Sequence, residues 1–464
     1  MTVPTSPPGG PPARELVGEL LARAQWTPER LAAHQRERLD GLLRHAVANS
    51  PYYRRVLGAD AAHGGVPLRE LPTLTKSALM EHFDEIVTDG RVRRGAAAAH
   101  LAGAEPGRLL AGHRVFSTAG STGERGIVVS SPAEFTVWTA AHLRMMATMG
   151  ATPGMRAVAI GSPSPGHLSR QMFAETGGPP GDAPELDVTT PMPELVARLN
   201  AYRPDAISTY ASIAALLAEE QLSGRLAIAP AMVAAGAEIL TEDMRRRVRD
   251  AWGVEPHQAY LATEAPLLAS TSAAQVGMHL WEDLVLVEVV DAAGRPVAPG
   301  VPGHKVLITN LVNRVQPLIR YELSDSVTLA PGPDPTGRPF RRLSDVDGRS
   351  YEIITLPAAG GATVSVHPAH LRSPFTAFPE VVQYQLTYDD GGLTGRVVLR
   401  PGAPSGIPDR LRAALTRRLR YAGAIPPPIT ITAVAGLARD TGHAAKFHQF
   451  SRPGHLPPPD EGPA

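Results

Sequence analysis

Apolar positions recur along this chain with two alternating spacings. Residues 27–48 have helical spacing and open with Thr-Pro-Glu, a typical helix start. Residues 131–134 form a second start signal, a capping box, which predicts a helix that ends at Gly150. Between residues 156 and 260, strands are predicted at 157–160, 206–210 and 232–235, and helices at 193–202, 212–220 and 242–252. This alternation predicts βαβ units around a mostly parallel sheet.

Beyond residue 264 the apolar pattern is that of strands separated by turns that contain Gly or Pro. Strands are predicted at 284–290, 305–311, 325–329, 352–356, 381–387, 396–399 and 429–434, and a helix at 408–419. The unit after Arg349 has roughly a hundred residues, enough to fold as a separate domain. We therefore predict an α/β fold with a large domain at 13–349 and a small α+β domain at 350–452. The Pro/Gly-rich tails, 1–12 and 453–464, are predicted to be disordered.

Composition narrows the class of protein. A chain of 464 residues is too long for one simple core. Its net charge of +0 argues against nucleic acid or an anionic membrane as a partner, and we find no apolar run long enough to span a membrane. The absence of cysteine excludes disulfides, thiolate zinc and a cysteine nucleophile, and favours a cytoplasmic location. Of 45 basic residues, only Lys76, Lys305 and Lys446 are lysines.

Four short segments rich in hydroxyl, glycine and charged residues follow one another along the chain. They are 117–123 (Ser-Thr-Ala-Gly-Ser-Thr-Gly), 260–264 (Tyr-Leu-Ala-Thr-Glu), 320–325 (Arg-Tyr-Glu-Leu-Ser-Asp) and 348–349 (Gly-Arg). The first lies between two strand-like segments, so we predict the loop of a hairpin and not a Walker phosphate loop. Its backbone N–H groups and hydroxyls can still wrap phosphates. The alternative is a flexible surface hairpin.

The other segments place charged and hydroxyl groups near strand ends. Thr263 and Glu264 suit an α-phosphate contact and a magnesium ligand, and the alternative is a turn with a solvated glutamate. Asp325, placed at the end of a strand that begins near Leu318, can accept hydrogen bonds from both ribose hydroxyls. Arg349, at the start of the small unit, can contact the same sugar or a phosphate. The alternative for this pair is a salt bridge between two domains.

In this order, the four segments resemble the adenylate-forming enzymes, which activate a carboxylate with ATP. Further stretches resemble the phenylacetate–CoA ligases and coenzyme F390 synthetases within that superfamily. They are 39–53, 71–76 (Leu-Pro-Thr-Leu-Thr-Lys), 236–238 (Gly-Ala-Glu), 240–245, 277–279, 282–283 and 317–321 (Pro-Leu-Ile-Arg-Tyr). The resemblance covers nearly all of residues 30–450 and implies a large domain followed by a small mobile domain.

The resemblance implies roles for individual positions. ATP phosphates would be held by Ser117, Thr118, Gly120, Ser121, Thr122 and Gly123. Adenine would be bordered by Gly236, Ala237 and Glu238 and stacked on Tyr260. Thr263 would meet the α-phosphate, Glu264 would hold Mg²⁺, and Asp325 and Arg349 would grip the ribose. The acyl group would lie between Tyr210, Ser212, Gly236, Pro266 and Leu267. Because the last segment is apolar, we expect an aromatic or otherwise apolar acid.

The implied reaction has two halves. A small-molecule carboxylic acid attacks the α-phosphorus of Mg·ATP and expels pyrophosphate, and the small domain then rotates so that the thiol of CoA takes the acyl group. A natural-product synthetase that passes the activated group to an amine or a carrier protein is an alternative, as is a diazo-forming enzyme that activates an oxyanion such as nitrite. A catalytically degenerate nucleotide-binding homologue and a homodimer also stay open.

The sequence departs from the family pattern at four places. Glu124-Arg125 replaces Lys-Pro after the phosphate loop, Leu261 replaces a glycine, and Tyr351 replaces an acidic hinge residue. In strict register, His443 replaces the catalytic lysine, and Lys446 follows three residues later. Three residues are about one helical turn, so Lys446 can take that role if the loop turns. We predict Lys446, His443 and Thr263 as the catalytic residues, with the choice between the first two open.

Overall fold

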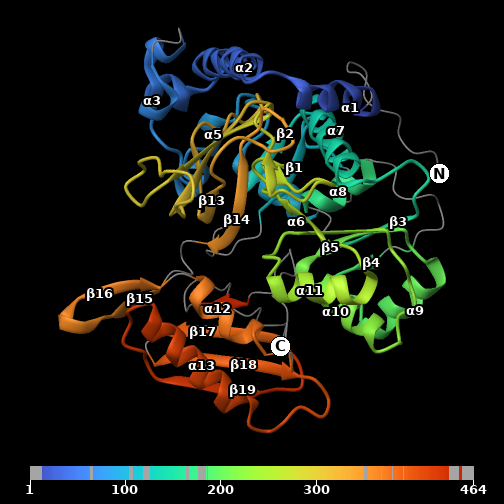
Figure 1. The fold of residues 1–464 in the computed structure, drawn as a ribbon. Coiled ribbons are helices and arrows are strands. Elements are labelled where there is room, and N and C mark those ends of the chain that lie inside the picture. Colours follow the sequence, from blue (N-terminus) through green and yellow to red (C-terminus); the bar gives the residue numbers. More distant parts are fainter. Residues whose placement is uncertain are drawn as a thin grey trace.

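The computed structural model describes most of the chain. The described residues are 13–62, 66–103, 108–118, 126–162, 167–175, 184, 186–349, 354–366, 368–378, 380–389, 391–437 and 449–451. Figure 1 shows a large upper domain and a smaller lower domain formed by the C-terminal segments. Among the described residues, no helix is long and apolar enough to cross a membrane.

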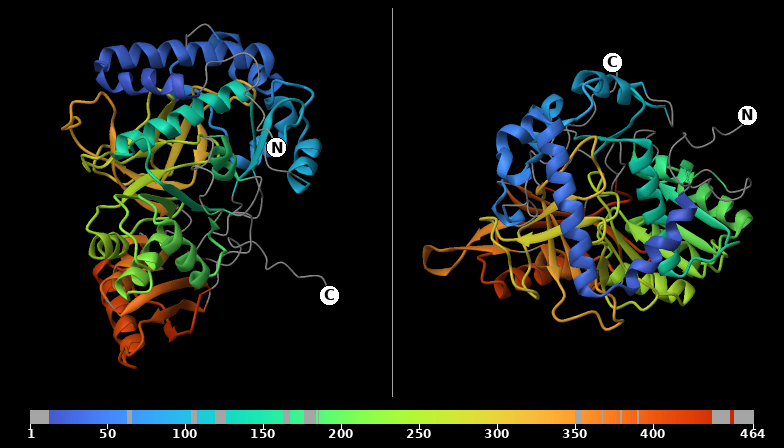
Figure 2. Two further views of the ribbon diagram at one scale, coloured as in Figure 1. Left: turned by 90° about the vertical axis from the view of Figure 1, so that its right-hand side faces the viewer. Right: turned by 90° about the horizontal axis from the view of Figure 1, so that it is seen from above.

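Helices α1 (Ala13–Ala22), α2 (Pro28–Asn49) and α3 (Pro51–Ala62) begin the large domain. In Figures 1 and 2, α1 and α2 lie at the end of this domain that is remote from the small domain. The predicted start of α2 is confirmed, because the Thr27 hydroxyl accepts a hydrogen bond from the Arg30 backbone N–H at 3.3 Å. Short elements follow: η1 (Arg23–Gln25), η2 (Leu68–Glu70), α4 (Lys76–Glu81), α5 (Phe83–Ile86) and α6 (Arg94–Ala102).

The predicted hairpin is confirmed. Strands β1 (Arg114–Ser117) and β2 (Ile127–Ser130) pair antiparallel, with Ser117 opposite Ile127. Helix α7 (Pro132–Met149) follows from the capping box of Ser131 and Glu134, and it ends at Gly150, whose φ is +108°. This positive φ favours glycine, which has no Cβ to clash. The loop of residues 119–125 lies outside the described part of the chain.

A sheet of 9 strands forms the centre of the large domain, in the order β13-β14-β9-β8-β7-β6-β5-β3-β4. Its parallel half contains β3 (Ala157–Gly161), β4 (Leu186–Asp187), β5 (Ala206–Tyr210), β6 (Met232–Gly236) and β7 (His257–Tyr260). The intervening helices are α8 (Leu168–Glu175), α9 (Met192–Tyr202), α10 (Ala211–Leu222) and α11 (Glu242–Trp252). The predicted βαβ alternation is therefore confirmed.

The antiparallel half corrects two predictions about strands. It contains β8 (Ala269–Ser270), β9 (Met278–Leu280), β13 (Asp325–Leu329) and β14 (Arg342–Arg349), and a second sheet contains β10 (Val285–Val290), β11 (Lys305–Asn310) and β12 (Tyr321–Leu323). Asp325 begins β13 and does not end a strand from Leu318. Arg349 ends β14, a strand we did not predict, and pairs with Asp325. Register shifts between β13 and β14 indicate bulges, which break the period of two that sequence patterns rely on.

The small domain contains a sheet of 4 strands with helices packed on it. The order is β19 (Ile429–Ala433), β18 (Gly392–Leu399), β17 (Val381–Asp389) and β20 (Phe450–Ser451). The remaining elements are β15 (Ile354–Pro357), η4 (Ala359–Gly361), β16 (Thr363–Val366), α12 (Pro368–Thr376) and α13 (Ile407–Tyr421). Its hydrophobic core is separate from that of the large domain, and α13 buries Ile407, Leu411, Leu415 and Leu419 at helical spacing in it.

Candidate active site

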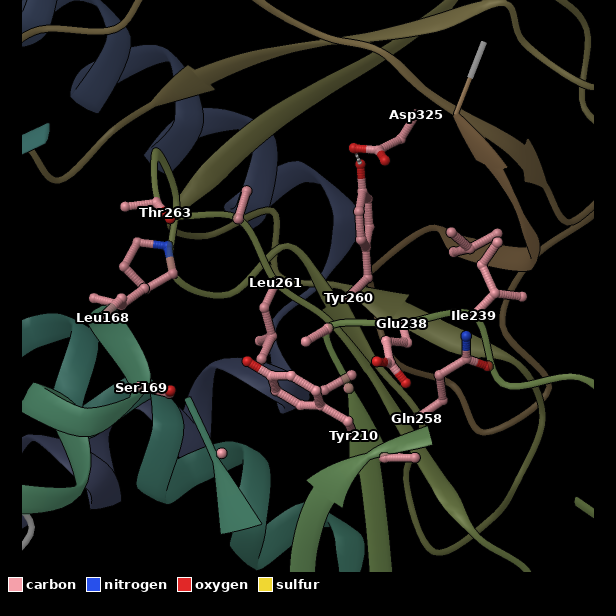
Figure 3. Close-up of a pocket in the computed structure, with 18 of the residues that line it drawn as sticks. Leu168, Ser169, Tyr210, Glu238, Ile239, Gln258, Tyr260, Leu261, Thr263 and Asp325 are labelled. Atoms are coloured by element: carbon pink, nitrogen blue, oxygen red, sulfur yellow. Dashed lines mark hydrogen bonds between the residues drawn. The ribbon is translucent and has the colours of Figure 1, made fainter. Parts of the chain in front are cut away.

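A cavity of ≈ 410 Å³ opens where the parallel strands of the large sheet end. Tyr210 ends β5, Gly236 ends β6 and Tyr260 ends β7, and all three line it. Figure 3 shows their surroundings, with Asp325 and Ile239 across the cavity from Leu168 and Ser169. In open α/β sheets, ligands bind outside the carboxyl ends of the strands, so this edge is the expected place for a site.

The structure brings most of the predicted site residues to this one cavity. The predicted residues that line it are Thr118, Tyr210, Ser212, Gly236, Ala237, Glu238, Tyr260, Thr263, Glu264, Pro266 and Asp325. They come from segments that lie up to two hundred positions apart in the sequence. Packing of distant loops against one sheet edge therefore assembles the candidate site.

Some predicted positions lie elsewhere or outside the described residues. Leu267 is buried in the hydrophobic core and does not line the cavity, although its neighbour Pro266 does. Ser117 is buried as the last residue of β1, one position before the lining residue Thr118. Gly348 lines the cavity next to Arg349, whose backbone ends β14 but whose side chain is not described. The predictions for Gly120, Ser121, Thr122, Gly123, His443 and Lys446 fall outside the described residues.

One wall is a tight turn after β6. Ala237 has a positive φ of 61°, and the backbone N–H of Glu238 donates to the carbonyl of Gly236 at 2.7 Å. The Glu238 carboxylate accepts a hydrogen bond from the backbone N–H of Ser212 at 2.9 Å. Ser212 lies in the first turn of α10, where N–H groups have no partner within the helix. The turn of residues 236–238 is therefore anchored to the start of α10.

Two tyrosine hydroxyls fix the carboxylates of the cavity. Tyr260 donates to Asp325 at 2.9 Å, the contact drawn in Figure 3. Tyr321 donates to Glu264 at 2.9 Å, and the amide of Asn310 donates to the Glu264 carbonyl at 2.9 Å. Burial and the neighbouring Glu264 carboxylate raise the pKa of Tyr321 far above its usual range, so its hydroxyl stays protonated and available as a donor. Both carboxylates are thus held in place before any ligand binds.

Lys76 is a lining residue that our sequence analysis did not assign to the site. It begins α4, after the helix-capping Thr75. A Cβ added to Gly126 would lie 3.2 Å from its Cε and 3.1 Å from the Thr118 hydroxyl oxygen. Gly126 also donates to that hydroxyl at 2.9 Å. Lys76 therefore lies at the base of the predicted phosphate loop. The rarity of lysine in this chain was the signal that could have identified it.

The structure adds a largely apolar wall that sequence patterns did not indicate. It is formed by residues of α7, β3 and α8, namely His142, Met145, Ile160, Leu168, Ser169 and Met172. Burial lowers the pKa of His142 to about 4, so its imidazole is neutral at neutral pH. From the small domain, Arg372 of α12 and Gln449 line the cavity. Helical periodicity alone cannot distinguish such lining residues from core residues.

The chain is similar to known ligases over most of its length. No family model matches it. It is 29% identical over 386 residues to the phenylacetate–coenzyme A ligase of Thermus thermophilus, covering 77% of this chain and 78% of that protein. It is 25% identical over 429 residues to the phenylacetate–coenzyme A ligase of Aromatoleum evansii, covering 87% and 90%.

Solved structures show the same fold. A 2-hydroxyisobutyryl-CoA ligase in its postadenylation state matches with a TM-score of 0.71 and 19% identity, covering 92% of this chain and 91% of that one. The same ligase in its thioesterification state matches with a TM-score of 0.55 and 19% identity, covering 96% and 95%. The structure described here is therefore closer in overall arrangement to the postadenylation state of that ligase.

Proposed function

Because the chain is a homologue of phenylacetate–CoA ligases and has the fold of the adenylate-forming superfamily, we propose that it is an acid–thiol ligase. It activates a carboxylic acid with ATP, releases pyrophosphate and transfers the acyl group from the acyl-adenylate to CoA. The observation that carries this proposal is the convergence of Thr118, Tyr260, Thr263, Glu264 and Asp325 on one cavity. They come from three segments that are distant in sequence, around Thr118, at residues 260–264 and at Asp325, and they meet at one edge of the large sheet.

The nucleoside binds between Tyr260 and the turn of residues 236–238. Adenine packs on the Tyr260 ring, and the ribose hydroxyls donate to Asp325. The hydrogen bond from the Tyr260 hydroxyl to Asp325 supports this assignment, since it fixes the ring and the carboxylate relative to one another. A site that is rigid before binding loses less entropy when the nucleotide arrives. Arg349, paired with Asp325 across β13 and β14, contacts the same sugar or a phosphate in this proposal.

The triphosphate binds along the phosphate loop, with Thr118 and Lys76 at its base. Their proximity at Gly126 supports this role for Lys76, because an ammonium group there balances phosphate charge. Glu264 would hold Mg²⁺, which would neutralise charge on the phosphate oxygens. Magnesium in proteins is commonly bound by one or two carboxylates together with substrate phosphates, so a single glutamate at the cavity wall fits this ion.

The chemical step is an in-line displacement at the α-phosphorus. A carboxylate oxygen of the acid forms a bond to phosphorus while the bond to the leaving pyrophosphate breaks. The protein contributes positioning and charge stabilisation, with Thr263 donating to an α-phosphate oxygen. A positive side chain from the small domain, Lys446 or His443, completes the stabilisation of the developing charge. In the second half, the CoA thiol attacks the acyl carbon and AMP leaves.

The acid lies against the wall formed by α7, β3 and α8, near Tyr210 and Pro266. Met145, Ile160 and Met172 make this wall largely apolar. An aromatic or otherwise apolar acid therefore fits best, because burial of its apolar surface supplies the binding free energy.

The test is acid-dependent pyrophosphate release with ATP, Mg²⁺ and a panel of aryl and small aliphatic acids. We expect release with at least one apolar acid, an acyl-adenylate detected by mass spectrometry, and an acyl thioester once CoA is added. Amines and a carrier protein replace CoA in parallel reactions to identify the acceptor. Folded protein that binds ATP in a calorimetric titration but releases no pyrophosphate with any acid would contradict the proposal and favour a nucleotide-binding homologue without catalysis.

A further inference from the structure

The two domains meet through an arginine at the centre of their contact surface. Helices α10 and α11 lie on the side of the large domain that faces the small domain (Figure 1). Arg247 of α11 is 6% exposed and donates to two consecutive backbone carbonyls of the small domain. Its guanidinium reaches Val382 at 2.9 Å and also reaches Val381. A buried side chain from one domain is thus bound to the backbone of the other.

The small domain presents these two carbonyls by means of a bulge. In the pairing of β17 with β18, Val381 lies opposite Leu399 and Gln383 opposite Val398, so Val382 is an extra residue. Consecutive carbonyls of a regular strand point in opposite directions, whereas a bulge turns the strand and changes that alternation. The bulge at Val382 therefore lets both carbonyls face one guanidinium, whose planar fork suits two acceptors.

Ion pairs surround this contact and one of them crosses between the domains. Arg247 pairs with Asp243 at 2.5 Å, one turn earlier on α11, and with Glu219 of α10 at 3.3 Å. Arg400, which follows β18, pairs with the same Glu219 carboxylate at 2.6 Å. Glu219 is therefore shared between an arginine of the large domain and one of the small domain. Arg247 and Asp243 are buried and the Glu219 side chain is 13% exposed, so removing a partner from these three leaves a charge without compensation, which is costly.

The same contact determines which small-domain residues reach the cavity. Met244 lies one turn before Arg247 on α11 and lines the cavity. Gln449 lines both the cavity and the domain contact next to Arg247, and Arg372 of α12 lines the cavity as well. Docking of the bulge on α11 thereby brings two polar small-domain side chains to the nucleotide cavity.

We infer that Arg247, Glu219 and Arg400 form an interdomain latch that positions the small domain for adenylation and opens before acyl transfer. The inference rests on the proposed function for its two half-reactions. The geometry supports this inference, because the latch holds the domain arrangement in which Arg372 and Gln449 of the small domain line the cavity. The closer match to a postadenylation state than to a thioesterification state agrees with this assignment. The latch residues are positioning residues, because none of them lines the cavity among the described residues.

The experiment compares two latch variants with a matched control. Arg400→Gln removes the ion pair that crosses between the domains, and it does so at a side chain that is 41% exposed, where a substitution disturbs packing little. Arg247→Lys keeps a positive charge but cannot span both carbonyls. Arg225→Gln removes an ion pair with Glu220, the residue next to Glu219, that lies within the large domain. Each variant is measured for pyrophosphate release, for CoA capture of a preformed acyl-adenylate, and for radius of gyration by small-angle X-ray scattering.

We expect Arg400→Gln to slow adenylation about threefold to fivefold, as for a partly exposed ion pair. Arg247→Lys should slow it about tenfold or more, because two charge-assisted hydrogen bonds are disturbed. Capture of the preformed adenylate stays unchanged or becomes faster, and the radius of gyration increases. Arg225→Gln behaves as wild type in all three measurements.

Two outcomes would overturn the inference. One is an equal fall in the rates of adenylation and of CoA capture; the other is an unchanged adenylation rate and an unchanged radius of gyration in both latch variants. Failure of the proposed function is a separate result. In that case the wild-type protein releases no pyrophosphate with any acid, and the scattering measurement still tests whether the latch holds the two domains together. A radius of gyration that neither latch substitution alters then refutes the latch.

Discussion

The large and small domains contribute to the cavity in different ways. The large domain supplies side chains that are already fixed by partners, as in the contacts of Tyr260 with Asp325 and of Tyr321 with Glu264. The small domain supplies, among the described residues, Arg372 and Gln449, whose place depends on how the domains dock. Side chains with fixed positions can bind a substrate throughout a reaction. Side chains that move with a domain can stabilise a charge that develops in only one step. Substitutions in the two domains test this division.

The largest effect is expected from the small domain. Lys446→Ala should slow adenylation by about two to four orders of magnitude, the range for one preorganised charge in a transition state. Capture of a preformed acyl-adenylate should change much less, because the charge is needed only while pyrophosphate leaves. Pyrophosphate release and thioester formation are measured separately. His443→Ala serves as the paired control with a smaller effect, and a reversed order of the two variants would assign the role to His443.

The second effect concerns the fixed carboxylate of the large domain. Glu264→Gln keeps an acceptor for the Tyr321 hydroxyl but removes the negative charge, so the proposed Mg²⁺ ligand becomes a weaker, neutral one. We expect adenylation to fall about a hundredfold, comparable with the loss of one preorganised group. Rates are measured across a magnesium titration. Tyr321→Phe retains the carboxylate, so its adenylation rate should fall less. Equal falls in the two variants would argue against a metal role for Glu264.

The third effect tests the base of the phosphate loop. Lys76→Met removes an ammonium group while keeping an unbranched side chain beside Gly126. We expect the KM for ATP to rise about tenfold, which corresponds to a charge-assisted hydrogen bond of about 1.4 kcal/mol. Steady-state kinetics with varied ATP provide the measurement. Lys305→Met is the matched control, since Lys305 pairs with Glu322 at 2.8 Å and does not line the cavity. A similar rise in both variants would remove the role assigned to Lys76.

The smallest effect concerns the tyrosine that orients Asp325. Tyr260→Phe keeps the ring and loses one hydrogen bond of 2.9 Å. A hydrogen bond to a charged group contributes about 1.5 kcal/mol or more, part of which water replaces, so we expect the KM for ATP to rise about fivefold. kcat should stay within a factor of about two, because ground state and transition state lose the contact alike. A fall in kcat with unchanged KM would contradict this assignment.

Local signals in the sequence predicted much of the fold. The start of α2 at Thr27, the capping box at Ser131 and the bounds of α11 were each predictable, because caps and helical spacing act within a few residues. β14 was not predictable, since its bulged pairing with β13 depends on partners distant in sequence. The largely apolar wall formed by α7, β3 and α8 and the position of Lys76 likewise result from long-range packing.

The residues of the candidate site also differ in whether local sequence or long-range packing brings them to the cavity. Tyr260, Thr263, Glu264 and Asp325 were proposed because they belong to short segments with a resemblance to a family, and all four line the cavity. Leu267 lies in the core while its neighbour Pro266 lines the cavity, a difference between adjacent residues that the apolar pattern alone did not indicate. Arg372 had no signal at all, since only docking of the domains brings α12 to the cavity.

Helix α10 connects the cavity wall formed by residues 236–238 with the contact between the two domains. Its first turn is bound by Glu238, and its last turn carries Glu219, which pairs with Arg400. A helix of 12 residues is about 18 Å long, and α10 carries these two contacts near its opposite ends. Under the proposed function, α10 therefore connects a turn that borders adenine with the contact between the domains. Because thermodynamic coupling is reciprocal, any factor by which nucleotide favours docking of the small domain must equal the factor by which docking tightens nucleotide binding.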